Sequence, residues 1–312
     1  MKLLATLCAL FFSSVLFSAS VDKIVLFGDS LSDNGNLYEY MKKKFPISPP
    51  YYKGRFTNGP VWIEILAAAH YSVDDKERLQ DYAIGGAGIL KEEDDDDGSL
   101  FTLKNEIDSF MLANKGVADP NALFVVWIGA NNYLGMPDEF EVEETFDLVL
   151  TSVDKGIKRL LSAGAKHVLI VNLPNLGHTP AARQLDAVEL LSSYSNKHNE
   201  RLLANFGQYK LDYPQVDWIF LDVDSMLDEV IDDPESLGFT NVKDTCYEAV
   251  LEKGKGSILQ MVASIKTKAK QDACSGFLFF DPVHPAARAH QILAQRAQNA
   301  LDEAKIKFVN KA

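Results

Sequence analysis

The architecture of this chain follows from the stretch IVLFGDSLSDNGN, residues Ile24–Asn36. Four apolar residues, two of them β-branched, run into a polar turn, which predicts a buried strand that ends near Gly28. Ligands of open α/β sheets bind outside the carboxyl ends of the strands, so the hydroxyl of Ser30 is placed to face a ligand. The alternative is that Ser30 only caps the next helix, as many serines after strands do.

The same pattern of a strand followed by a polar turn repeats along the chain, alternating with helical segments. Further strands are predicted at Tyr82–Ile84, Leu123–Ile128, His167–Val171 and Val216–Leu221. Helices are predicted from Pro60, at about Leu100–Asn114, Asp138–Ala163 and Ala181–Tyr209, and from Pro285 to about Asp302. This alternation indicates βαβ crossovers and a mostly parallel sheet with helices on both faces. No Gly-, Pro- or Ser-rich linker divides the chain, so residues 21–312 are expected to form a single domain.

Residues 1–20 differ from the rest of the chain. Lys2 precedes an almost wholly apolar run from Leu3 to Leu16, and small residues follow at Ser18 and Ser20. This pattern predicts a cleaved signal peptide, so we expect a secreted protein, periplasmic or extracellular, that begins near Val21. The apolar run is shorter than the roughly twenty residues of a membrane-spanning helix, and no later stretch reaches that length.

Charge restricts the class of binding partner. The formal net charge of −13 argues against nucleic acid and bare anionic membranes, but a zwitterionic lipid headgroup remains compatible with it. Six consecutive acids, Glu92–Asp97, predict a solvated loop. A calcium site is the alternative for this run, although the alternating ligand pattern of an EF-hand is missing.

Two cysteines, Cys246 and Cys274, remain outside the signal peptide. An exported protein meets an oxidising compartment, so we expect a disulfide between them, with two unpaired buried thiols as the alternative. The segment between them carries five lysines on an otherwise acidic chain. A protease could cut this lysine-rich loop while the disulfide keeps both parts of the chain together. The alternative, which the sequence supports as well, is that the disulfide-closed loop is a static brace.

The turn DPVHP, Asp281–Pro285, supplies the remaining groups of a serine hydrolase. Such an enzyme needs a nucleophile, a base, a carboxylate that orients the base, and N–H donors for the oxyanion. Asp281 and His284 are three residues apart between prolines, so one short turn can present both, and none of the other five histidines has an aspartate at that spacing. The alternative for His284 is a surface or capping histidine.

Other catalytic signatures are missing. The sequence has no Gly-x-Ser-x-Gly motif of α/β-hydrolases, no His-Glu-x-x-His motif and no Cys/His cluster. The glycines at Gly85–Gly88 lack the Gly-Lys-Ser/Thr ending and the spacing of nucleotide-binding loops. We therefore expect neither a metal nor another cofactor.

Four blocks in this order resemble those of the GDSL, or SGNH, lipase/esterase family. They are FGDSLSDNGN at Phe27–Asn36, GGAG at Gly85–Gly88, GANN at Gly129–Asn132 and DPVHP at Asp281–Pro285. The resemblance spans Val21 to about Asp302 and implies a flavodoxin-like three-layer α/β/α sandwich. It implies Ser30 as nucleophile, His284 as base and Asp281 as orienting acid. It also implies an oxyanion hole formed by the backbone N–H groups of Ser30 and Gly86 and the side-chain amide of Asn131.

The exported form and the cysteine-bounded segment 246–274 resemble a subgroup of this family, the secreted bacterial phospholipases that include lysophospholipase A and glycerophospholipid:cholesterol acyltransferases. The resemblance implies a lipid or lysophospholipid substrate, and in this subgroup such a loop is associated with activation by a protease. We expect apolar and aromatic residues of the Pro46–Tyr52 loop and of the strand ends to line an acyl groove. Lipid ester hydrolysis is the predicted reaction. Acyl transfer to a sterol or another alcohol is one alternative, and a non-catalytic lipid- or carbohydrate-binding protein on the same fold is another.

Overall fold

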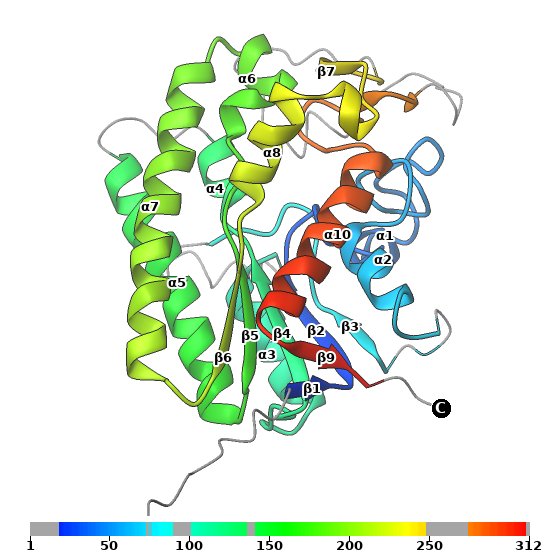
Figure 1. Cartoon of the computed structure of the whole chain (residues 1–312). Helices are drawn as coiled ribbons and strands as arrows, with labels where there is room; N and C mark the ends of the chain where they lie inside the picture. Colours follow the sequence, from blue (N-terminus) through cyan, green and yellow to red (C-terminus); the bar gives the residue numbers. More distant parts are fainter. Residues whose placement is uncertain are drawn as a thin grey trace, which may run out of the picture.

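A five-stranded, fully parallel sheet forms the centre of the computed structural model, which describes residues 19–72, 75, 77–89, 101–135, 141–247 and 274–309. The strands are β2 (Lys23–Gly28), β3 (Leu79–Asp81), β4 (Ala122–Trp127), β5 (His167–Val171) and β6 (Asp217–Leu221). They lie in the order β3-β2-β4-β5-β6 (Figure 1). Counted along the chain, this is the order 2-1-3-4-5 of flavodoxin-like folds. The predicted α/β/α sandwich is therefore confirmed.

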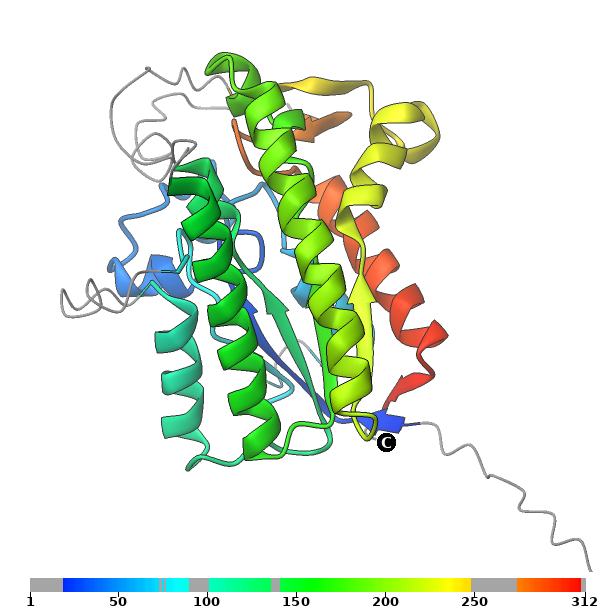
Figure 2. The same cartoon turned by 90° about the vertical axis from the view of Figure 1, so that its left-hand side faces the viewer.

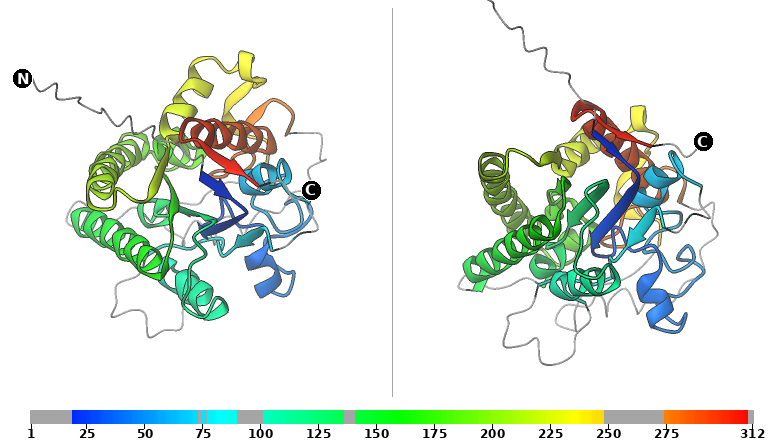
Figure 3. Two further views of the ribbon diagram at one scale, coloured as in Figure 1. Left: turned by 60° about the horizontal axis from the view of Figure 1, so that its bottom comes forward. Right: turned by 90° about the horizontal axis from the view of Figure 1, so that it is seen from below.

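Helices cover both faces of this sheet, as Figure 2 and Figure 3 show from the side and from below. One face packs against α3 (Leu103–Ala113), α5 (Glu141–Ala163) and α7 (Val188–Asp212), and the other against α2 (Trp62–Ala68) and α10 (Ala287–Glu303). All six residues of β4 are buried, with alternate side chains in the two helical layers. Burial on both faces explains why the strands are continuous apolar runs in the sequence.

Shorter elements surround this sandwich. The short helices and 3₁₀ turns are α1 (Asn36–Tyr40), α4 (Ala130–Leu134), η2 (Leu176–His178), α6 (Pro180–Gln184), α8 (Val223–Asp232) and η3 (Glu235–Leu237). Two further parallel pairs join β1 (Ala19–Val21) to β9 (Ile306–Phe308) and β7 (Asn241–Thr245) to β8 (Phe277–Phe279). The strand β1 includes the last two residues of the predicted signal peptide.

Two predicted elements are wrong in their bounds. The second strand is Leu79–Asp81 and not Tyr82–Ile84. The Tyr82 and Ile84 N–H groups still bond to carbonyls of β2, but the Gly28 N–H bonds to Glu106 and not back to this segment, so the regular ladder ends. The predicted helix Ala181–Tyr209 is two helices, α6 and α7. Asp186 adopts a left-handed conformation with φ of 54°, and the Ala187 N–H bonds to the Ala182 carbonyl, which closes α6.

Several predictions fall outside the described residues. They are signal-peptide residues 1–18, the acidic run Glu92–Asp97, the lysine-rich interior of the 246–274 segment, and the first residues of the helices predicted from Leu100 and Asp138. Across the parts of the chain that the structure describes, no helix combines the length and apolarity needed to cross a bilayer.

A buried acid links α3 to the end of β2. Glu106 is 2% exposed, and its Oε2 accepts the Gly28 N–H at 2.8 Å, two residues before Ser30. Burial raises the pKa of Glu106 well above its ordinary value, although the Gly28 bond lowers it, and the nearby carboxylates of Asp81, Asp29 and Asp33 raise it further. Between the ordinary and the raised pKa, the native state holds a proton that the unfolded chain releases, so stability falls as pH rises through this window.

We expect Glu106→Gln to weaken this loss of stability at high pH, because the amide keeps an acceptor for Gly28 and does not ionise. Thermal unfolding at pH 5 and pH 8 should show a smaller drop in Tm for the variant than for the wild type. A difference of a few degrees is expected, since 1 kcal/mol moves the Tm of a large domain by roughly 2 °C. Glu200→Gln, at an exposed position of α7, is the control. Equal drops in wild type and Glu106→Gln would contradict the assignment.

Candidate active site

Three side chains from distant parts of the sequence form one hydrogen-bond chain. Ser30 follows β2, and its Oγ lies 2.8 Å from Nε2 of His284, 254 residues later. His284 Nδ1 lies 2.7 Å from Oδ2 of Asp281. Asp281 is fully buried, whereas Ser30 and His284 keep 7% and 6% of their surface exposed. The structure thus brings together the serine, histidine and aspartate that the sequence singled out, in the geometry of a nucleophile, a base and its orienting acid.

The Asp281–Pro285 turn is held by backbone hydrogen bonds to its own first residue. Oδ1 of Asp281 accepts the N–H groups of Val283 at 2.9 Å and His284 at 2.8 Å, which leaves Oδ2 for the imidazole. Burial raises the pKa of Asp281, but the charge and hydrogen bond of His284, a hydrogen bond from Tyr51 and the Val283 N–H outweigh it, so the pKa lies below its ordinary value. Asp281 is therefore a carboxylate in the working pH range.

Two aromatic residues complete the surroundings of this turn. The Tyr51 hydroxyl donates to Oδ2 of Asp281 at 2.7 Å, and the Phe56 ring lies 5.1 Å from the imidazole of His284. Phe56 was not predicted as part of the site, and Tyr51 was expected only among the aromatic residues that would line an acyl groove, not as a partner of Asp281. The sequence showed only an aromatic, proline-rich segment, and no local pattern indicates that a tyrosine 230 residues before an aspartate contacts it.

The Gly85–Gly88 turn is hydrogen-bonded to Asp33, just after Ser30, and to Asn131. The N–H groups of Gly85, Ala87 and Gly88 bond to Asp33 Oδ2, the Ile84 carbonyl and the Phe101 carbonyl. Among the described residues, no acceptor takes the N–H of Gly86, which has φ of 81°. Asn131 donates its side-chain amide to the Ala87 carbonyl at 2.7 Å and lines the same pocket as Ser30, whereas Gly86 does not line it. The oxyanion-hole roles of Ser30, Gly86 and Asn131 remain predictions.

Asp33 ties the serine turn to the glycine turn. Its fully buried carboxylate accepts four backbone N–H groups, those of Gly35, Asn36, Leu37 and Gly85, at 2.6 to 3.1 Å. These bonds fix the chain that follows Ser30 against the chain that follows β3. The Asn36 side-chain amide, which donates to the Asp81 and Ala83 carbonyls, adds to the bonds of Asp33 in setting the relative position of the two turns.

Asp29, the residue before Ser30, lines the pocket and is 3% exposed. Burial raises its pKa to about 6, against the lowering effect of the Leu31 N–H, which donates to Oδ1 at 3.0 Å, and of the charge of His284. A second titratable group therefore lies next to the proposed nucleophile.

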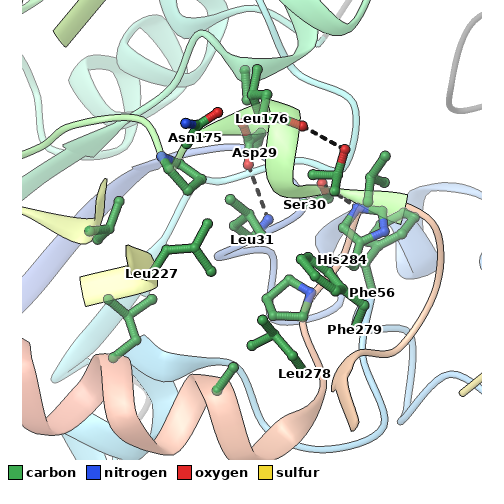
Figure 4. A pocket seen from close by; sticks show the side chains of 18 of the residues that line it. Asp29, Ser30, Leu31, Phe56, Asn175, Leu176, Leu227, Leu278, Phe279 and His284 are labelled. Atoms are coloured by element: carbon green, nitrogen blue, oxygen red, sulfur yellow. Dashed lines mark hydrogen bonds between the residues drawn. The ribbon is translucent and has the colours of Figure 1, made fainter. Parts of the chain in front are cut away.

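The pocket that opens at Ser30 and His284 is lined mostly by apolar side chains (Figure 4). Its volume is about 1030 Å³ including the open mouth. Figure 4 shows Leu227 and Leu278 across the pocket from Ser30. The far walls come from α8, α10 and β8, with Met226, Leu227, Val230, Leu278, Ile292 and Leu293 among the lining residues. None of residues 46–52 lines it, and residues 48–52 line a separate pocket, so the expected acyl-groove role of the Pro46–Tyr52 loop stays a prediction. That loop packs instead on the far side of Asp281, as Tyr51 shows.

Cys246 and Cys274 form a disulfide, with their Cα atoms 5.1 Å apart. The Cys246 N–H bonds to the Phe279 carbonyl, and the Tyr247 N–H to the Phe280 carbonyl, so the disulfide lies beside the strand that leads into Asp281. Within the described segments, no group of three or more His, Cys, Asp or Glu side chains is arranged to hold a metal ion.

Several known proteins resemble this chain in sequence. The sequence matches the family GDSL-like Lipase/Acylhydrolase over residues 24–297. It is 29% identical to the phosphatidylcholine-sterol acyltransferase of Aeromonas hydrophila over 316 residues, 90% of each chain. It is 25% identical to the secreted effector protein SseJ of Salmonella typhimurium over 280 residues, 88% of this chain but 62% of that protein.

Among solved structures, a member of the lipolytic protein G-D-S-L family from Veillonella parvula aligns with a TM-score of 0.48 at 16% identity, over 90% of this chain and 99% of that chain. The family match to the sequence extends from β2, just before Ser30, past His284 and into α10. Because the match covers most of the sequence and includes Ser30, Asp281 and His284, the protein belongs to the GDSL-like lipase/acylhydrolase family.

Proposed function

We propose that this protein is a serine esterase that hydrolyses the acyl esters of lipids, and that it acts as a lysophospholipase or phospholipase A. The observation that carries the proposal is the Ser30 hydroxyl, 2.8 Å from His284 Nε2 at the mouth of an apolar pocket. An apolar wall favours a fatty acyl chain over a sugar acetate, because burial of each methylene contributes about 0.8 kcal/mol.

The reaction follows from the hydrogen-bond chain. His284 Nε2 takes the Ser30 proton while Ser30 Oγ attacks the acyl carbonyl, and Asp281 stabilises the imidazolium. The oxyanion is held by the N–H groups of Ser30 and Gly86 and by the amide of Asn131. The proton passes from His284 to the leaving alcohol, and water, activated by the same imidazole, then releases the fatty acid from Ser30.

The hydrogen bonds of the Gly85–Gly88 turn support Gly86 as the oxyanion donor from this turn. Its neighbours Gly85, Ala87 and Gly88 already donate to protein acceptors. Asn131 lies in α4, directly after β4, which pairs with β2, and it lines the same pocket as Ser30, which supports its role as the third donor. In the flavodoxin-like strand order, this junction of the first and third strands is the switch point at which ligands bind.

Ser30→Ala is expected to lower kcat/KM for a lysophospholipid by at least about a thousandfold, because the nucleophile is removed. Fatty acid release by the purified protein measures the effect. An organophosphonate probe should label the wild type but not Ser30→Ala. Ser32→Ala, which removes the other serine hydroxyl of this turn, is the control and should be labelled. Full activity or labelling in Ser30→Ala would contradict the proposal. A wild type that neither releases fatty acid nor reacts with the probe would favour a non-catalytic binding protein.

Leu227→Trp is expected to discriminate between acyl chains, because it enlarges a side chain on the pocket wall opposite Ser30. For esters of a sixteen-carbon acid we expect kcat/KM to fall about tenfold or more, and for acetate esters to change less than about threefold. Leu211→Trp, at an exposed position of α7, is the control. Equal losses on long and short chains would show that the acyl chain does not occupy this pocket.

Acyl transfer is a second candidate, favoured by the similarity to the phosphatidylcholine-sterol acyltransferase of Aeromonas hydrophila. The same acyl-enzyme would form, and an alcohol would replace water as the acceptor. In vesicles of phosphatidylcholine and a sterol, we expect free fatty acid to exceed steryl ester, with both products absent for Ser30→Ala. An excess of steryl ester would make transfer the main reaction.

A further inference from the structure

Tyr51 contacts the reactive groups through the carboxylate of Asp281. Its hydroxyl donates to Oδ2 of Asp281 at 2.7 Å, and the same oxygen is bound by His284 Nδ1 at 2.7 Å. The phenol is 2% exposed and the carboxylate is fully buried, so water does not replace either partner readily. Tyr51 therefore occupies the remaining hydrogen-bonding direction of the oxygen that orients the base.

The ring of Tyr51 is held on several sides. It lies edge-on to Phe280 with a centroid distance of 5.0 Å and to Phe56 with one of 5.9 Å. The same buried cluster contains Tyr247 and one cysteine of the disulfide, Cys274. Because both neighbouring rings are fixed, the hydroxyl has a defined direction and can hold Asp281 in one orientation.

We propose that Tyr51 is a positioning residue of the esterase reaction, which acts by fixing the Asp281 carboxylate that orients His284. This inference rests on the proposed function. The alternative is that Tyr51 fills space beside Asp281 and that its hydroxyl is dispensable.

The protonation states support the direction of this bond. Burial and the neighbouring charge of Asp281 raise the pKa of Tyr51 well above its ordinary value, so the phenol remains a donor. Without the hydroxyl, Oδ2 of Asp281 would keep only its bond to His284, and a buried lone pair would lose its partner. The carboxylate could then turn more freely, so the orientation of the imidazole would be less well defined. Its negative charge, no longer shared with the phenol, would also stabilise the protonated form of His284.

Tyr51→Phe tests the proposal, since it removes only the hydroxyl. With a soluble short-chain ester, we expect kcat to fall about tenfold, KM to change less than twofold, and the acidic limb of the kcat/KM profile to move to higher pH. Asp29 and His290, the other titratable groups whose charges act on His284, are retained in the variant. Tyr52→Phe is the control, because its neighbouring phenol makes no contact with Asp281 among the described residues.

A double-mutant cycle separates positioning from packing. In an Asp281→Asn background, adding Tyr51→Phe should lower kcat less than twofold further, because its effect passes through the carboxylate. Thermal unfolding of every variant shows whether the fold is retained. An unchanged kcat and pH profile in a folded Tyr51→Phe would overturn the inference, as would a full additional loss in the Asp281→Asn background. Activity retained by Ser30→Ala would instead overturn the proposed function itself.

Discussion

The position of the candidate active site depends on a buried carboxylate that must be hydrogen-bonded. Asp33 accepts four backbone N–H groups, one of them from Gly85 and three from the chain just after Ser30. A buried carboxylate without such partners would be strongly unfavourable, so the fold must supply these donors. The bonds hold two turns that follow different strands, and the parallel register of β2 with β4 brings Asn131 to the same edge. The backbone around Ser30 is thereby held in one arrangement by hydrogen bonds within the protein.

The sequence predicted most of the sheet, because strands buried on both faces are continuous apolar runs that end in polar turns. His167–Val171 was predicted with its observed bounds, and the run after Lys23 within a residue of them. The second strand was misplaced because Leu79–Asp81 lacks such a run and forms through pairing with β2. The break at Asp186 was missed because a left-handed residue other than glycine has little local signature.

For the site, the sequence identified the three groups of the Ser30–His284–Asp281 hydrogen-bond chain and missed the residues that surround them. Ser30, Asp281 and His284 are polar residues in turns between apolar runs, so they stand out, and the structure places them within hydrogen-bond distance of one another. The pocket walls gave no such signal. Leu227 and Val230 have the spacing of any amphipathic helix, and a helix that faces a cavity has the same pattern as one that faces a core. Tyr51 likewise depends on a tertiary contact.

The two sides of the Ser30–His284–Asp281 chain are built from different parts of the protein. The apolar pocket is walled by α8, α10 and β8, whereas Asp281 is backed by the cluster of Tyr51, Tyr247 and Cys274. If the protein acts as proposed, substitutions in α8 would change which acyl chains it accepts, and substitutions of Tyr51 or Tyr247 would change the rate of turnover. Substrate choice and catalytic rate would then evolve through largely different sets of residues that meet at one histidine.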